Sequence, residues 1–224
     1  MLEVIPGILE KEWAEIERKI NLVKSFATAI HIDIIDGKFA SNATFLDPKP
    51  FQRYTSGLFF ELPMMVEEPI NYLKPFAAAG FKRFLGHIEK MSDQEEFVAQ
   101  GQLLGEVGLA VDGPTPLEAI KVSYGDLDSI LIMTIKAGQS GQEFNPEYLK
   151  KVEILRQVPS GAWLRTASND MSIGVDGGIN DQTIIEVKNA GATRFIANSF
   201  IFSSNSPTGG PQAQFNLLQE RIHQ

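Results

Sequence analysis

The chain has 224 residues and a formal net charge of -8, with 43% hydrophobic and 21% charged residues. This composition is typical of a globular protein and excludes a disordered chain. The acidic balance, without any basic run, argues against a nucleic-acid partner, which would need clustered Lys and Arg. The absence of cysteine excludes disulfides, thiolate metal sites and cysteine nucleophiles. We find neither a signal-peptide pattern nor an uninterrupted apolar run of membrane-spanning length, so we expect a cytoplasmic protein without a membrane partner.

Strand-like and helix-like patterns alternate from one end of the chain to the other. Segments rich in β-branched and aromatic residues predict strands at 4–9, 29–35, 58–66, 81–89, 106–111, 128–135, 171–179 and 192–200. Apolar periodicity and end signals predict helices at 11–24, 70–80, 92–105, 117–122, 146–158, 181–191 and 212–222.

Eight strands with crossovers between them, in a little over 200 residues, match a (β/α)₈ barrel. A dinucleotide-binding open sheet is disfavoured, because no GxGxxG follows the first strand. We therefore predict an α/β fold, with residues 1–224 forming a single (β/α)₈ TIM-barrel domain. Its site should lie at the carboxyl ends of the strands, as in other barrels of this kind.

Polar residues interrupt two of these strands. In AIHIDII, the isoleucines at 30, 32 and 34 suit the helix-packed exterior, which turns His31 and Asp33 inward together. In SIGVDGG, Asp176 points inward at the end of its strand. The three side chains could bind a divalent metal, or the two carboxylates could exchange protons on either face of a carbon. The spacing alone leaves a third interpretation equally open, in which His31 and Asp33 form a buried structural pair.

Glycine-bearing turns follow the later strands. VDGGIN at 175–180 leads directly into a helix, AGQSGQ covers 137–142, and ANSF covers 197–200. Barrels frequently bind phosphate after strands seven and eight, where backbone N–H groups approach the anion. With the inward acids nearby, these turns favour a phosphate-binding site.

Taken together, these segments resemble the ribulose-phosphate 3-epimerase family. The resemblance covers nearly the whole chain, and the combined motifs are far more specific than any one of them. The motifs that carry it, in chain order, are HIDIIDGKFASNATF (31–45), GHIEK (86–90), LAVDGPTP (109–116), MTIKAGQSGQEF (133–144) and VDGGIN (175–180).

The resemblance implies a barrel of the ribulose-phosphate-binding type that epimerises C3 of a phosphorylated ketose, by default D-ribulose 5-phosphate to D-xylulose 5-phosphate. Asp33 and Asp176 would be the two acids of a proton shuttle through a cis-enediolate. A divalent metal would be held by His31, Asp33 and Asp176. The resemblance also places substrate- or phosphate-binding groups at Gly141, Gly177, Gly178, Asn198, Ser199, Met65 and Met133.

The chain departs from the family pattern at several positions. Pro63 stands where the family has a second metal-binding histidine, and a proline side chain cannot coordinate a metal. Gly7 replaces a serine, and Asn198 replaces the glycine before Ser199. We therefore expect the metal to be weakly bound or absent, without distinguishing Mn, Mg, Zn or Fe. Rescue of the missing ligand by Glu61 or His87 is a weaker expectation than a fourth position filled by water.

Two alternative functions follow from these departures. One is a ketohexose-phosphate 3-epimerase, because Gly7 and Ile35 alter the cavity away from the phosphate. The other is a catalytically weak or non-catalytic sugar-phosphate-binding paralogue, which Pro63 favours and the retention of both acids opposes. The sequence leaves open whether the chain forms a homo-oligomer.

Overall fold

The protein is described by a computed structural model covering residues 1–138, 142–159, 171–203 and 209–224. Its strands are β1 (Glu3–Ile8), β2 (Ala29–Ile32), β3 (Ile34–Ile35), β4 (Phe59–Met65), β5 (Arg83–His87), β6 (Glu106–Val111), β7 (Ser129–Met133), β8 (Ser172–Asp176) and β9 (Arg194–Ala197). Its α-helices are α1 (Trp13–Val23), α2 (Ile70–Ala78), α3 (Gln94–Gln102), α4 (Lys150–Gln157), α5 (Thr183–Asn189), α6 (Ser199–Phe202) and α7 (Pro211–His223).

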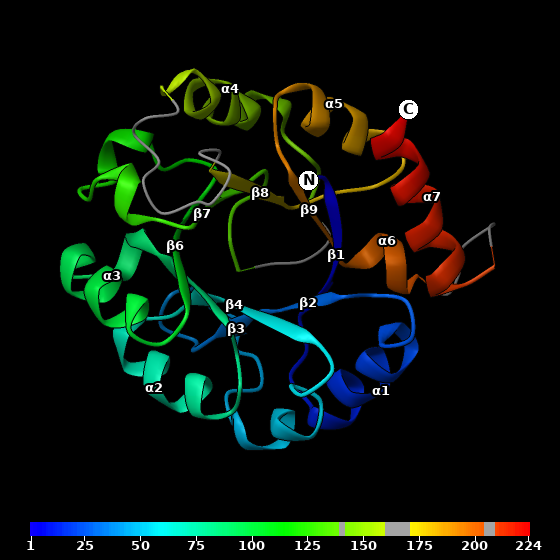
Figure 1. Cartoon of the computed structure of the whole chain (residues 1–224), viewed down its shortest axis with the longest axis horizontal. Coiled ribbons are helices and arrows are strands. Elements are labelled where there is room, and N and C mark those ends of the chain that lie inside the picture. The colour runs from blue at the N-terminus through cyan, green and yellow to red at the C-terminus, as the bar shows by residue number, and fades with distance from the viewer. Residues whose placement is uncertain (139–141, 160–170, 204–208) are drawn as a thin grey trace.

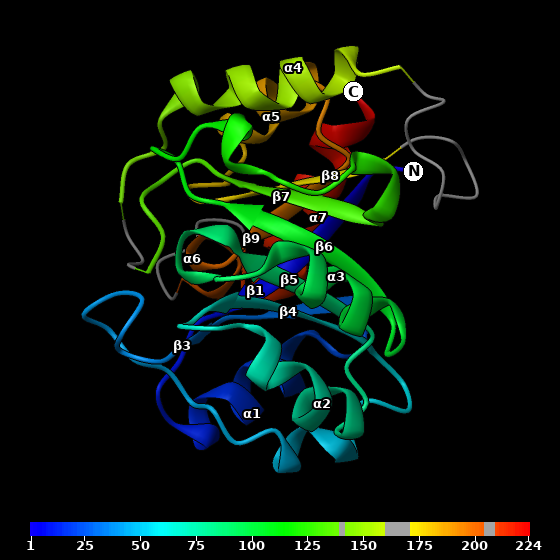
Figure 2. The same ribbon diagram turned by 90° about the vertical axis from the view of Figure 1, so that its left-hand side faces the viewer.

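The strands form one closed parallel sheet. Its order is β2-β1-β9-β8-β7-β6-β5-β4-β3, and β2 also pairs with β4. Because β2 and β3 are consecutive pieces of one strand, the nine segments occupy eight positions around the barrel. Figure 1 shows the helices surrounding the strands, and Figure 2 shows the same layers from the side. The predicted (β/α)₈ barrel is confirmed.

The break between β2 and β3 falls at Asp33, opposite a proline. The register pairs His31 with Glu61 and Ile34 with Met64, which sets Asp33 against Pro63. Proline has no N–H to donate to a neighbouring strand. The hydroxyl of Thr44 instead donates to the carbonyl of Asp33 at 3.0 Å, and it accepts from the Ile35 N–H at 2.9 Å. A loop side chain thus takes over the hydrogen bonding at the position where the ladder is interrupted.

Two hydrophobic cores lie on the two faces of the sheet. The larger one, between strands and helices, contains Ile30, Ile32 and Ile34, as the alternation predicted. The smaller one fills the barrel interior and consists of Ile35, Met65, Leu85, Ala110, Leu131, Met133, Ala137 and Ile196. Since successive strand residues point to opposite faces, His31 and Asp33 share the interior with Ile35.

Some predicted elements are shorter than expected. The helix predicted at 117–122 is a single 3₁₀ turn, Leu117–Ala119, following Pro114 and Pro116. The predicted strands 171–179 and 192–200 end earlier, at Asp176, where the Gly177–Gly178 turn follows, and at Ala197, just before α6. In the part of the chain that the structure describes, no helix combines the length and apolarity needed to cross a bilayer.

Candidate active site

Three ionisable side chains converge at the carboxyl end of the barrel. The Nε2 atom of His31 lies 3.5 Å from Asp33 Oδ1 and 4.0 Å from Asp176 Oδ2. One ligand atom from each residue fits within a spread of 4.8 Å. We call these three residues the ligand cluster. The strand alternation thus brings together residues that are 143 positions apart in the chain (176 minus 33).

Glu61 fixes the orientation of the His31 ring. Its Oε1 lies 2.5 Å from Nδ1 of His31, and both side chains are fully buried. A carboxylate only accepts hydrogen bonds, so Nδ1 must carry the proton and donate it. Nε2 is then the ring nitrogen that faces Asp33 and Asp176. This is the arrangement in which a histidine is ready to bind a metal.

The ligand cluster contains buried polar atoms without partners. Among the described residues, neither His31 Nε2 nor Asp33 Oδ1 has a hydrogen-bond partner. Buried polar atoms are nearly always paired, and an exception calls for an explanation such as an ion. One imidazole nitrogen and two carboxylates form a donor set that suits a divalent cation. The residues present therefore fit a metal site.

The Asp176 carboxyl is electrostatically unusual. Burial, and then the nearby Asp33 carboxylate, raise its pKa to about 7, although His31 and the Gly177 N–H act in the opposite direction. Two acids that face each other in a buried site cannot easily both be charged. A carboxyl with a pKa near neutrality can hold or release a proton, which suits general acid–base chemistry.

A second charged group occupies the barrel interior near the amino ends of the strands. The other oxygen of Glu61, Oε2, accepts from Arg194 and, at 2.9 Å, from Arg83. Arg194 also donates to the Ser129 hydroxyl at 3.1 Å. We call Glu61, Arg83, Arg194 and Ser129 the arginine network. Gly174 leaves room for it, because a Cβ there would stand 3.3 Å from an Arg194 guanidinium nitrogen.

A cavity of about 520 Å³ opens at the carboxyl end of the barrel. It brings Asp33 and Asp176 together with six of the seven predicted substrate-binding residues, Met65, Met133, Gly177, Gly178, Asn198 and Ser199. The seventh, Gly141, lies outside the described residues. His31 stands behind the two acids and is fully buried.

The turn after β8 requires glycine at both positions. Gly177 and Gly178 have φ values of 113° and 69°, which residues with a side chain rarely adopt. A Cβ on Gly177 would also meet Ile135 at 2.8 Å. The Thr134 hydroxyl lies 3.0 Å from the Asp176 carbonyl and 2.5 Å from that of Gly177, and so anchors the turn. The backbone of this turn lines the cavity.

The structure does not support either predicted rescue of the missing ligand. Pro63 is buried on the interior face of β4, between Glu61 and Met65. Glu61 is bound to the His31 ring and to two arginines, so it is not available as a ligand. His87 is buried with Nδ1 3.2 Å from Glu89 Oε2, and it is not part of the described ligand cluster.

Sequence reasoning missed the roles of three charged residues of the site. Glu61 was considered only as a ligand, whereas it orients His31. Its signal was present, because Glu61 and Arg194 are opposite charges inside strands that are otherwise mostly apolar. Lys19 and Glu10 also line the cavity. Lys19 lies in α1, and no local sequence pattern distinguishes it from the other polar residues of that helix.

Comparisons with known proteins agree with this geometry. The family model described as "Ribulose-phosphate 3 epimerase family" matches residues 3–202. The ribulose-phosphate 3-epimerase of Schizosaccharomyces pombe is 32% identical over 212 residues, covering 92% of this chain and 89% of that protein. The Bacillus subtilis enzyme of the same name is 31% identical, with coverage of 92% and 94%.

Solved structures with much lower identity share the fold. KGPDC from Streptococcus mutans superposes with a TM-score of 0.70 at 11% identity, covering 99% of this chain and 97% of the other. The 3-hexulose-6-phosphate synthase from Salmonella typhimurium gives 0.69 at 12%, with coverage of 98% and 100%. The family match spans all the strands of the barrel and contains the ligand cluster and the Gly177–Gly178 turn. The chain belongs to the ribulose-phosphate 3-epimerase family, and with it to the isomerases.

Proposed function

We propose that the protein epimerises C3 of a ketose phosphate, with D-ribulose 5-phosphate and D-xylulose 5-phosphate as the default pair. The observation that carries this proposal is the meeting of Asp33 and Asp176, from opposite parts of the chain, beside His31 in one cavity. Inversion at carbon needs a base on one face and an acid on the other. If His31 and Asp33 formed only a structural pair, the protein would not need the second carboxylate, Asp176, across the cavity.

The two aspartates divide the reaction between them. The Asp33 carboxylate takes the C3 proton, and the electron pair of the broken C–H bond forms the enediolate with the C2 carbonyl. The Asp176 carboxyl returns a proton to the opposite face of C3, so the carbonyl is restored and the configuration inverted. In the reverse direction the two residues exchange roles. The raised pKa of Asp176 suits this duty, because the carboxyl can be protonated near neutral pH.

A divalent metal fits the same residues. His31 Nε2, Asp33 and Asp176 would hold it, and the unpartnered Nε2 and Oδ1 atoms support this assignment. When bound, such an ion supplies Lewis-acid stabilisation of the oxygen charge that develops in the reaction. The hydrogen bond from Nδ1 to Glu61 orients the His31 ring so that Nε2 faces the two aspartates. With Pro63 in place of a fourth protein ligand, we expect the ion to be held weakly.

The other lining residues position the sugar phosphate. The backbone of the Gly177–Gly178 turn and of Ser199 can approach the phosphoryl group, and Met65 and Met133 present apolar surface beside the acids. Glycine at 177 and 178 allows the close approach of backbone to anion.

A longer substrate, a ketohexose phosphate, is a second candidate. Gly7 pairs in register with His31, and a Cβ there would stand 3.0 Å from Cγ2 of Ile196, which lines the cavity. Ile196 therefore occupies the space that a side chain at position 7 would take, and Gly7 does not by itself enlarge the cavity. The choice between a ketopentose and a ketohexose phosphate rests on the assay below.

Exchange of the C3 proton with deuterated solvent tests the proposal most directly. We expect the purified protein, supplied with Mn²⁺, to wash deuterium into C3 of D-ribulose 5-phosphate and to form D-xylulose 5-phosphate in a coupled assay. Faster exchange with a ketohexose phosphate would select the second candidate. Absence of exchange with either class, at every metal loading, would leave a sugar-phosphate-binding protein without epimerase activity.

A further inference from the structure

A buried lysine reaches the cavity from outside the barrel strands. Lys19 belongs to α1, on the helix face that also buries Ile16, Ile20 and Val23. The residue is only 8% exposed, yet it lines the same cavity as Asp33 and Asp176. Lysines are rarely buried without a partner, so its position requires an explanation.

Lys19 lies at one end of the cavity, the end that is lined by the segment after β9. Its ammonium lies 3.5 Å from Asn198 Oδ1 and 4.6 Å from the centre of the Phe202 ring. It also pairs with Glu10 Oε1 at 2.8 Å. Asn198, Ser199 and Phe202 all line the cavity, as does the Gly177–Gly178 turn. Lys19 therefore belongs to the part of the cavity assigned to the phosphoryl group.

The charge of the cavity makes this lysine significant. Its described lining residues include three carboxylates, those of Glu10, Asp33 and Asp176, but only one cationic side chain, that of Lys19. A dianionic phosphate entering such a cavity is repelled by the acids unless a cation lies close to it. The ammonium has three N–H donors, and Glu10 and Asn198 account for two of them. Among the described residues no other hydrogen-bond partner of this ammonium is found, so the third N–H is offered to an incoming anion.

We infer that Lys19 is a specificity-determining residue that binds the phosphoryl group of the substrate through its ammonium. Glu10 and Asn198 hold the ammonium in place, and the Phe202 ring shields it from water on one side. This inference rests on the proposed function, because it takes the phosphoryl group of that substrate as the ligand. It predicts that the Lys19 side chain, and not only the backbone of the glycine turns, makes the protein prefer phosphorylated over unphosphorylated sugars.

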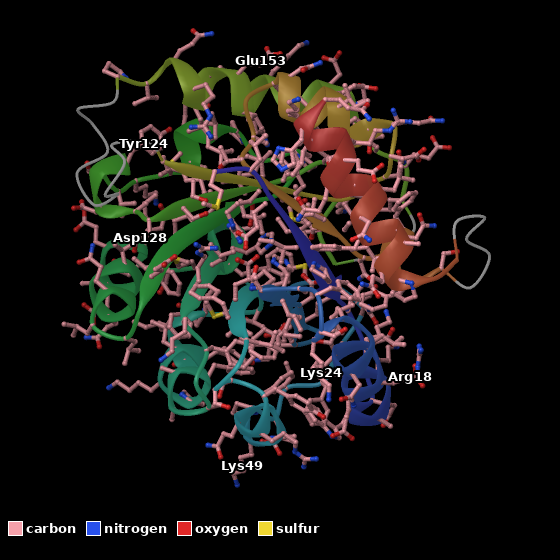
Figure 3. The ribbon with its side chains drawn as sticks, turned by 45° about the vertical axis from the view of Figure 1, so that its right-hand side comes forward. Arg18, Lys24, Lys49, Tyr124, Asp128 and Glu153 are labelled. Carbon is pink, nitrogen blue, oxygen red and sulfur yellow. The ribbon has the colours of Figure 1, made fainter. Side chains whose placement is uncertain are left out.

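The test compares Lys19→Met with Arg18→Met, the same charge change one residue away. Arg18 points outward from α1, as Figure 3 shows, and pairs with Glu15. Calorimetric titration with inorganic phosphate should show affinity reduced by about tenfold to a hundredfold in Lys19→Met, the usual worth of a hydrogen bond to a charged group. Arg18→Met should bind as the wild type does, and D-ribulose without a phosphate should bind equally to all three proteins.

A further variant separates binding from a structural role. Lys19→Arg should keep most of the phosphate affinity, because it retains the charge. A folded Lys19→Arg variant that binds phosphate as weakly as Lys19→Met would show that the positive charge at position 19 does not bind the anion, and that result would overturn the inference.

The outcomes distinguish this inference from the proposed function. Unchanged phosphate affinity in a folded Lys19→Met variant, checked by its melting temperature, refutes the role of Lys19 even if the wild type is an active epimerase. Phosphate binding that depends on Lys19, in a protein that exchanges no C3 proton, refutes the epimerase activity and leaves Lys19 as the anion-binding residue.

Discussion

The barrel interior holds two groups of charged residues that are joined through one histidine and differ in how they are paired. In the arginine network, Glu61 is shared by His31, Arg83 and Arg194, and Arg194 also reaches Ser129. Among the described residues, only the Nε of Arg194 lacks a partner in that network. In the ligand cluster, His31 Nε2 and Asp33 Oδ1 are both unpartnered, and the two carboxylates repel each other.

The difference indicates which group serves structure and which serves chemistry. Buried charges are tolerated when opposite charges and hydrogen bonds satisfy them, as in the arginine network. A cluster of like charges with unpartnered atoms costs stability unless something binds there. We therefore expect substitutions in the ligand cluster to reduce activity, and substitutions in the arginine network to reduce stability.

The largest effect should come from the two acids. Asp33→Asn and Asp176→Asn each remove a group that must give or take the C3 proton, so we expect turnover to fall by at least about 10²–10⁴-fold. Asp33→Asn should cost more if the residue also holds the metal. The coupled assay measures this loss, and phosphate affinity should survive both changes. Full activity in either variant would remove that residue from the proposed mechanism.

Glu61→Gln should destabilise the protein by about 3–5 kcal/mol, because it leaves Arg194 with an uncompensated buried charge. Arg194 is only 3% exposed. Urea unfolding measures the change in free energy. The matched control is Glu106→Gln, whose carboxylate also pairs with Arg83 but whose side chain is 43% exposed. We expect the control to cost no more than about 1 kcal/mol. Equal costs would show that the arginine network is not the stabilising unit.

Pro63→His should strengthen metal binding. Position 63 faces the interior opposite Asp33, so an imidazole there would add a nitrogen donor beside the ligand cluster. Changes around a metal site alter affinity by about 10–100-fold, and we expect a gain of this size. Competition with a chelator measures it. Pro63→Ala is the control, because it also restores the backbone N–H but offers no ligand. A similar gain in Pro63→Ala would trace the effect to the backbone instead.

The last expected effect is a change in stability. Its sign differs between the two groups, because neutralising Asp176 in the ligand cluster should stabilise the protein, whereas substitutions in the arginine network should destabilise it. The folded-state pKa of Asp176, about 7, exceeds the ordinary value of 3.8, so its charged form destabilises the metal-free fold as pH rises from about 4 to about 7. Asp176→Asn should therefore stabilise the metal-free protein at pH 8 and leave its stability unchanged at pH 4. Urea unfolding in chelator at both pH values tests this. A loss of stability at pH 8 would mean that Asp176 is structurally paired.

The sequence was sufficient for the barrel and for the ligand cluster, and the reason lies in strand alternation. The isoleucines at 30, 32 and 34 identify the exterior face, so His31 and Asp33 must point inward. The place of Lys19 in the cavity could not be predicted from the sequence. No local pattern shows that this residue of α1 contacts Asn198, 179 positions later in the chain. The sequence also did not reveal that Glu61 binds His31, since Arg194 and Arg83 determine where that carboxylate lies.

The contact between Glu61 and Arg194 also bears on the order in which the chain folds. The two residues are 133 positions apart, and Arg194 belongs to β9, the last strand to be synthesised. Until β9 docks against β1, the carboxylate of Glu61 lacks that partner, and burying it in a partly formed barrel is costly. A fragment that ends before β9 should therefore remain loosely packed around β2 and β4. Closure of the barrel becomes a late step dominated by long-range contacts, which is the kind of step that slows folding.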